Sequence, residues 1–194
     1  MTSELRWRIM SLQAVMVIIF AIGAGFLFWA SAYSHSTVTD ELKAQQIVFP
    51  TKTNAEFKAL PAVNQKAMAP YAGQTMTTGD QARTYANNFI KVHLGEMGMT
   101  YSQASLAAMT HPKNLKLQNL VATIFKGTTL RSMLLNAYGW WTVGTYAGLA
   151  AIVALLAAIG VCGAFLFELL VAMRKEGERS VARRSSRAQA VPVA

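Results

Sequence analysis

Two long apolar segments stand near the two ends of the chain. The first covers residues 10–33 and the second residues 142–173, and no charged residue stands between Tyr146 and Phe167. A helix needs about 20 apolar residues to cross the roughly 30 Å hydrocarbon core of a bilayer. Both segments meet this requirement, so the pattern predicts two transmembrane helices.

The first segment also allows a different interpretation, as a cleaved signal peptide. Basic residues precede it, and Ala30-Ser31-Ala32 has the small-residue pattern of a cleavage site. Its apolar run is longer than the roughly 7–15 residues that are usual in a signal peptide. We therefore predict that the segment stays attached as a membrane anchor.

The region between the spans, residues 34–141, has a helical period and no strand-like alternation of useful length. The first helix is expected to continue about three turns beyond Tyr33, until Phe49-Pro50 stops it. Thr78 is a candidate helix cap. Apolar positions with helical spacing follow it: Ala82, Tyr85, Ala86, Phe89, Ile90 and His93. The sequence therefore predicts an all-α fold, a two-span transmembrane hairpin whose long helices extend into an extracytoplasmic helical domain. The helix that begins at Thr78 is expected to pack across both extensions.

Other parts of this domain carry weaker signals. Residues 51–77 are expected to be largely irregular, and three aromatic side chains are expected to hold them onto the helices: Phe49, Phe57 and Tyr71. A short helix is predicted from Tyr101 or Ser102 to Met109. An amphipathic helix is predicted from Leu115 toward the second span, with interruptions at Gly127 and at the cluster of residues 138–141.

The chain carries a formal net charge of +9, and the placement of its basic residues predicts the topology. Six Lys and Arg residues stand in residues 174–194, and Arg6 and Arg8 stand in residues 1–9. Positive charge beside the ends of spans marks the cytoplasmic side. We therefore predict a multi-pass protein of the cell membrane with both termini cytoplasmic, a disordered C-terminal tail, and residues 34–141 outside. The basic residues also suit the anionic headgroups of a lipid bilayer, and no nucleic-acid partner is predicted.

Aromatic residues flank both spans, as they do at the two interfaces of a membrane. We predict five interface anchors: Trp7, Trp29, Tyr33, Trp140 and Trp141. Helix packing is predicted at Gly144 and Gly148, which are four residues apart and allow a second helix to approach closely. Ala21 and Gly25 have the same spacing in the first span and are the expected partners. Glycine is also common in membrane helices without a packing role, and both interpretations remain open.

Four residues suggest a metal site. His93 and Glu96 are three positions apart on a predicted helix, as in carboxylate–histidine sites, and the thioethers of Met97 and Met99 suit Cu(I). The other interpretation is structural, because Met often fills a core and a single His on an apolar face is commonly packed. Copper is the only cofactor that the sequence suggests.

Glu168 is the one carboxylate in the second span. A charge inside a membrane is costly, which suggests proton or ion handling. The side chain can also reach the inner interface or pair with Arg6 or Arg8. The second interpretation is the one that we expect.

The chain has no motif for nucleophilic catalysis and no phosphate-binding glycine loop. Its only cysteine, Cys162, lies in the second span and cannot form an intramolecular disulfide. We expect a non-catalytic accessory or assembly subunit of a larger cell-envelope complex, respiratory or transport, with membrane-protein partners or self-association. Docking is expected through the helix of residues 78–95 and exposed aromatic side chains at Phe49, Phe57 and Tyr71. The alternatives are an extracytoplasmic metal-handling or sensory protein and a homo-oligomeric channel with Glu168 facing its pore.

Two stretches of the sequence are similar to a known group of proteins: TTGDQARTYANNFIKVHLGEMGMTYSQAS and, after it, FKGTTLRSMLLNAYGWW. Together with the extension around Leu42, these residues resemble small two-span membrane proteins of actinobacteria. Some members of that group carry the label of an aromatic ring-opening dioxygenase small subunit. Three scattered histidines offer no counterpart to the iron ligands of such an enzyme. The resemblance therefore implies the two-span topology and no mechanism.

Overall fold

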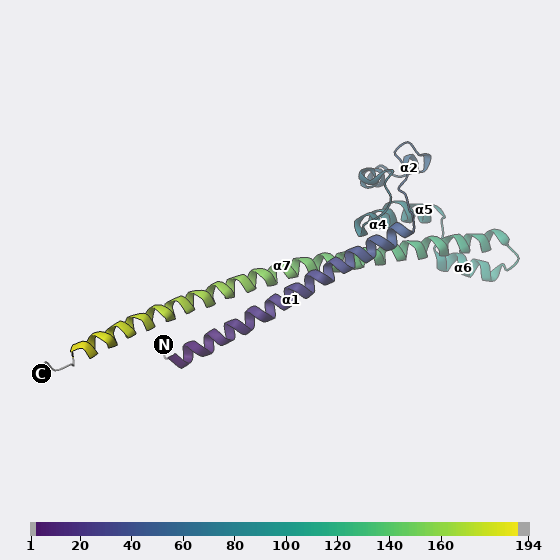
Figure 1. The fold of residues 1–194 in the computed structure, drawn as a ribbon. Coiled ribbons are helices and arrows are strands. Elements are labelled where there is room, and N and C mark those ends of the chain that lie inside the picture. The colour runs from purple at the N-terminus through teal and green to yellow at the C-terminus, as the bar shows by residue number, and fades with distance from the viewer. Residues whose placement is uncertain (1–2, 190–194) are drawn as a thin grey trace. The chain divides into compact units, whose positions relative to one another are not determined.

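The computed structural model describes residues 3–189, and every regular element in that range is a helix. Two long helices carry the apolar segments, α1 (Ser3–Ala44) and α7 (Leu115–Gln189). The short elements between them are α2 (Ala55–Ala59), α3 (Ala62–Met68), the 3-10 turn η1 (Ala69–Tyr71), α4 (Gly79–Tyr85), the π-helix η2 (Ala86–Ile90), α5 (Lys91–Glu96) and α6 (Tyr101–Thr110) (Figure 1). The predicted all-α fold is confirmed.

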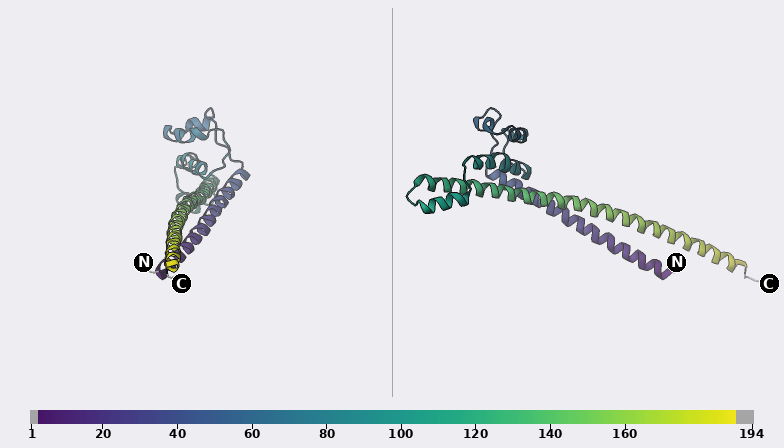
Figure 2. Two further views of the ribbon diagram at one scale, coloured as in Figure 1. Left: turned by 60° about the vertical axis from the view of Figure 1, so that its left-hand side comes forward. Right: turned by 180° about the vertical axis from the view of Figure 1, so that it is seen from behind.

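The chain divides into two compact units, and α1 and α7 contribute to both. The first unit joins residues 1–29 to residues 148–194, and the second consists of residues 30–147. Both long helices can be followed along their length in Figure 2. The predicted domain of residues 34–141 lies within the second unit, and the positions of the membrane boundaries stay a prediction.

Each long helix is long and apolar enough to cross a membrane. The most apolar windows of α1 and α7 have mean hydropathies of 2.3 and 2.7, and only 6% and 11% of these windows are buried inside the protein. A soluble protein would cover such surfaces with its own chain, because exposed apolar area is costly in water. The two helices are therefore compatible with insertion into a membrane.

Small side chains are buried in the first unit. Ala24 on α1 and Ala151 and Ala158 on α7 are buried. Ala21 and Gly25, the partners expected from the sequence, are exposed, and a Cβ built on Gly25 would meet no described atom within 4 Å. This expectation is corrected: the buried small residue of α1 is Ala24. Neighbouring residues of a helix point about 100° apart, so an error of one position selects the wrong face.

In the second unit, α1 and α7 are joined near Gly144. A Cβ on Gly144 would lie 3.0 Å from side-chain atoms of Ser34 and His35, so only glycine allows this approach without a shift. The Ser34 hydroxyl donates a 2.7 Å hydrogen bond to the Trp140 carbonyl, and His35 Nε2 lies 3.1 Å from the Trp141 carbonyl. Gly148, the other residue of the predicted pair, is partly buried.

The hydrophobic core of the second unit draws on almost every element. Its largest fully buried side chains are Phe49, Leu42, Met68, Met76 and Leu134. The α4–η2 segment packs in this core together with residues of α1 and α7, which confirms the packing predicted for the helix that follows Thr78. Phe49 and Phe57 belong to the same core, and Tyr71 is partly buried against it.

Capping boxes fix where α4 and α6 begin. The Thr78 hydroxyl accepts from the Gln81 amide, and the Gln81 side-chain oxygen accepts from the Thr78 amide. Thr100 and Gln103 form the same reciprocal pair before α6. Each pair satisfies backbone donors that a helix start leaves free. The predicted cap Thr78 is confirmed, and of the two starts predicted for the second helix, Tyr101 and Ser102, α6 uses Tyr101.

α7 corrects two expectations. It continues without a break through Gly127 and residues 138–141. A glycine costs a helix only about 1 kcal/mol, and the side chain of Leu94 packs over Gly127, whose missing Cβ makes room for it. The helix also continues through residues 174–189, where a disordered tail was expected, because Arg, Glu and Ala favour helix and an existing helix needs no new nucleus. Residues 190–194 lie outside the described part of the chain.

We predict that Gly79→Ala destabilises the second unit. Gly79 is buried, and a Cβ at this position would overlap the Trp141 side chain. Relief would require movement of a packed helix, at a cost of about 1–3 kcal/mol in the free energy of unfolding. The measurement is the thermal midpoint of the full-length protein, followed by Trp fluorescence.

Gly95→Ala is the matched control for this substitution. A Cβ on Gly95 meets no described atom within 4 Å, and alanine is the better helix former by about 1 kcal/mol. The control should therefore keep or raise the midpoint. An unchanged midpoint in Gly79→Ala would show that the close contact with Trp141 is absent in solution.

Candidate functional site

A polar pocket lies on one face of the α4–η2 segment. Its volume is about 420 Å³, and it is lined by Tyr71, Asp80, Arg83, Thr84, Asn87 and Asn88. Five of the six side chains recur at positions i, i+3, i+4, i+7 and i+8, so one helix face supplies them. The sixth, Tyr71, comes from η1. The opposite face of the same segment carries the apolar residues that enter the core.

The two asparagines of the pocket are held by hydrogen bonds to separate elements. The Asn88 amide donates to the Thr84 carbonyl at 3.1 Å, and its oxygen accepts from Asn64 of α3 at 3.0 Å. The Asn87 oxygen accepts from the Arg131 guanidinium of α7 at 2.9 Å. Hydrogen bonds within the protein therefore fix the orientation of both amides.

Both asparagines lie on η2, the single π-helical turn of the described chain. The Lys91 amide donates to the Ala86 carbonyl five residues earlier, in place of the usual four. Such a turn is rare and is frequent at functional sites, because it widens the helix and redirects the side chains that follow. Its position at this pocket marks the pocket as the leading candidate site.

Arginine side chains connect the pocket to α7. The Arg83 guanidinium donates to the Tyr138 hydroxyl at 3.0 Å and lies 4.9 Å from the centre of the Tyr138 ring. Arg131 donates to Asn87, while its Nε is sealed from solvent and has no hydrogen-bond partner among the described residues. The Arg83 guanidinium is thus held at the edge of the pocket by Tyr138. Arg131 does not line the pocket, but it holds Asn87, which does.

The predicted copper ligands are only partly brought together. His93 and Met97 line a second, apolar cavity of about 290 Å³ between α5 and α7, whereas Glu96 and Met99 are exposed and do not line it. His93 Nδ1 lies 2.8 Å from the Phe89 carbonyl, so this nitrogen carries the proton. Among the side chains that the structure describes, no group of three His, Cys, Asp or Glu is placed to hold a metal ion.

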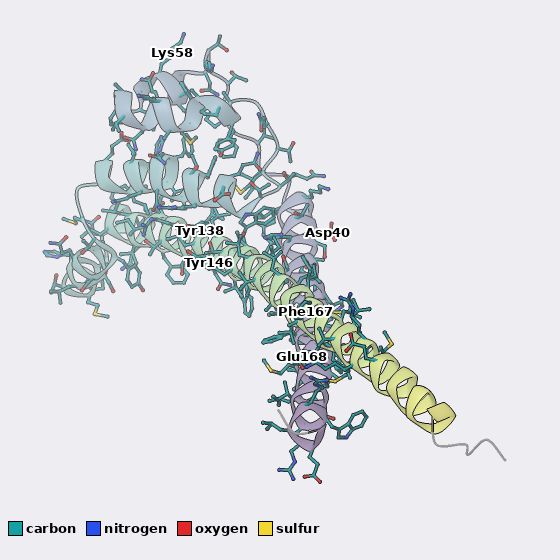
Figure 3. All side chains as sticks on the ribbon, turned by 90° about the vertical axis from the view of Figure 1, so that its left-hand side faces the viewer. Asp40, Lys58, Tyr138, Tyr146, Phe167 and Glu168 are labelled. Carbon is teal, nitrogen blue, oxygen red and sulfur yellow. The ribbon has the colours of Figure 1, made fainter. Side chains whose placement is uncertain are left out.

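Glu168 lies on α7 in the first unit (Figure 3). Its Oε2 is sealed from solvent without a hydrogen-bond partner among the described residues, and Oε1 of Gln13 is in the same state. The pairing expected with Arg6 or Arg8 is therefore not made through this oxygen. Two unpartnered acceptors in an apolar unit are costly, and neither contacts a described donor.

The predicted interface anchors fall into two groups. Trp7, Trp29, Tyr33 and Trp140 all have exposed side chains. Trp141 differs, because its ring lies 4.2 Å from the ring of His35 and packs against Gly79. Trp141 thus serves the packing of the second unit.

The end of the α6–α7 hairpin exposes apolar side chains. Leu106 is 65% exposed, and Met109 and Leu115 are each 75% exposed. The other face of α6 is covered, since Ala104 and Ala108 are buried. We call Leu106, Met109 and Leu115 the hairpin patch.

Comparisons with protein-family models, with curated proteins and with solved structures returned no match. The placement of the side chains therefore carries the functional proposal.

Sequence reasoning missed the polar pocket and the hairpin patch. A polar stripe on a helix looks like an ordinary solvated face, and the Asn87–Arg131 bond joins residues 44 positions apart. One signal was available: two adjacent asparagines, which are poor helix formers, stand in the middle of a strongly periodic helix.

We predict that Asn87→Ala destabilises the second unit through Arg131. The substitution removes the acceptor of a guanidinium whose Nε already has no described partner. The loss should be about 1–3 kcal/mol in the free energy of unfolding, measured in urea. Arg131→Met in the Asn87→Ala background should cost less than the sum of the single changes, because the two residues are coupled. If the losses of stability from the two single substitutions simply add in the double variant, the hydrogen bond between Asn87 and Arg131 is contradicted.

Tyr85 gives the second unit a dependence on alkaline pH. Burial, aided by the negative charge of Glu56, raises the pKa of Tyr85 above its ordinary value of 10.0. Above pH 10 the unfolded chain therefore loses this proton while the folded chain keeps it, so the stabilising contribution is present below pH 10 and is lost as pH rises through the raised pKa.

We predict that Tyr85→Phe removes this part of the pH dependence. The tyrosine ring packs between Phe49 and Phe89, at centroid distances of 5.3 and 4.8 Å, and phenylalanine keeps those contacts. The measurement is the free energy of unfolding of both proteins from pH 8 to 11. Parallel curves for the two proteins would show that Tyr85 titrates normally.

Proposed function

We propose that this chain is a non-catalytic integral membrane protein that serves as an accessory or assembly subunit of a larger cell-envelope complex. The two long apolar helices supply the membrane anchor. The basic residues at both ends favour cytoplasmic termini, with residues 34–141 outside. In this arrangement the second unit is the part of the chain that meets other proteins.

The hairpin patch is the observation that carries the proposal. Large apolar side chains that are strongly exposed on a domain in water favour an interaction site, because exposure costs free energy that a partner removes. The aromatic residues first expected to dock do not fit this role, since Phe49 is 1% exposed and Phe57 is 4% exposed. Both belong to the core of the second unit, and docking is therefore assigned to the hairpin.

The charged residues near the patch favour one kind of partner. Residues 97–167 contain no aspartate or glutamate. Lys113, Lys116 and Lys126 lie at the hairpin turn and along the adjoining part of α7, and all three are exposed. An apolar surface whose charged neighbours in the sequence are all basic complements an apolar surface with an acidic rim. We therefore assign as partner a membrane protein that presents such a surface on the same side of the bilayer.

Photo-crosslinking in native membranes tests this assignment. A benzoylphenylalanine at Leu106 or Met109 should form an adduct with one defined membrane protein. The same probe at Lys58, an exposed residue of α2 (Figure 3), should not. The double substitution Lys113→Glu and Lys116→Glu should reduce the adduct several-fold, and acidic-to-basic changes on the partner should restore it.

Two outcomes would contradict the proposal. Adducts only between copies of this chain would make the hairpin patch a self-association surface. Equal adducts from the hairpin and from Lys58 would show that contact is not specific. In both cases circular dichroism of the variants would establish that the helical fold is intact.

A further inference from the structure

The polar pocket on α4–η2 contains one side chain of each charge. Asp80 and Arg83 are three positions apart on α4, so they lie on one face of the helix. A purely anionic ligand would meet the Asp80 carboxylate, and a purely cationic ligand would meet the Arg83 guanidinium. The pocket therefore suits a neutral ligand that both donates and accepts hydrogen bonds.

Several polar groups of the pocket are free to bind. The Asp80 carboxylate and the Thr84 hydroxyl line the pocket and have no hydrogen-bond partner among the described residues. Arg83 uses one terminal nitrogen on Tyr138 and keeps further donors. The pocket thus offers an acceptor, a planar donor and a hydroxyl. A pair of neighbouring hydroxyl groups on a ligand can satisfy all three, since each hydroxyl both donates and accepts.

Tyr71 adds an aromatic face to this polar set. Its ring is held by Phe49, at a centroid distance of 5.4 Å with the planes inclined by 50°. An aromatic ring beside fixed polar groups gives a ligand both an apolar contact and a defined orientation. A pyranose ring has apolar C–H faces and a rim of hydroxyl groups, and it matches both features.

We propose that this pocket binds a neutral saccharide. The pocket volume of about 420 Å³ lies in the range of small-molecule sites. Preorganised polar groups avoid part of the ordering cost of binding, and here hydrogen bonds from α3 and α7 hold both asparagines in place. The π-helical turn η2 places these asparagines at the pocket. This inference is independent of docking through the hairpin patch.

The test uses the full-length protein in phospholipid nanodiscs, because detergents with sugar headgroups would compete for the pocket. The probes are maltotriose, cellotriose and chitotriose, which are neutral and differ in linkage and substituents. Saturation-transfer NMR should detect binding of at least one of them. Asp80→Asn and Thr84→Val should each weaken this binding about ten-fold, the loss expected for one good hydrogen bond. Lys58→Gln is the control variant and should bind as the unchanged protein does.

Three results would overturn the inference. The first is the absence of a saturation-transfer signal with all three trisaccharides. The second is binding of inorganic phosphate or spermidine in preference to them, which would assign the pocket to a charged ligand. The third is saccharide binding that Asp80→Asn and Thr84→Val leave unchanged, because it would lie elsewhere on the protein.

Discussion

The polar backbone of an apolar segment needs hydrogen-bond partners where water is absent, and a helix supplies all of them within the segment. The two apolar segments become helices for this reason, and α1 and α7 continue as helices well beyond them. The second unit is therefore built on two long helices, and the short elements of residues 45–114 pack against them. Its core follows this arrangement, since Leu42 comes from α1 and Leu134 from α7.

Glycines determine how closely the elements pack. Gly144 lets α7 approach Ser34 and His35, Gly79 lets α4 approach Trp141, and Gly127 receives the side chain of Leu94. A sequence pattern treats a glycine inside a helix as an interruption because its propensity is low. At Gly127 and Gly144 of α7 a neighbouring side chain occupies the place of the missing Cβ, so packing offsets the low helix propensity of glycine at these two positions. This explains why the predicted break at Gly127 is absent.

Local signals predicted much of the fold and little of the site. Periodicity and caps such as Thr78 placed the long helices, α4 and α6, because those signals lie within a few residues of each other. The α3 helix was missed, since residues 62–68 contain too few turns to show a period. The polar pocket was missed because Asn64, Asn87 and Arg131 come from distant parts of the chain and meet only through the core.

The distribution of carboxylates separates the two candidate surfaces of the second unit. Asp80 lines the polar pocket, where it offsets the positive charge of Arg83. The hairpin lies in a stretch of the sequence from residue 97 to residue 167 that has no carboxylate at all. The basic residues beside the hairpin patch act over a range of about 8 Å at physiological salt, whereas the polar pocket, with one residue of each charge, favours contacts set by hydrogen-bond geometry. The two proposed sites therefore depend on different charged residues, and neither proposal draws on the charges that the other uses.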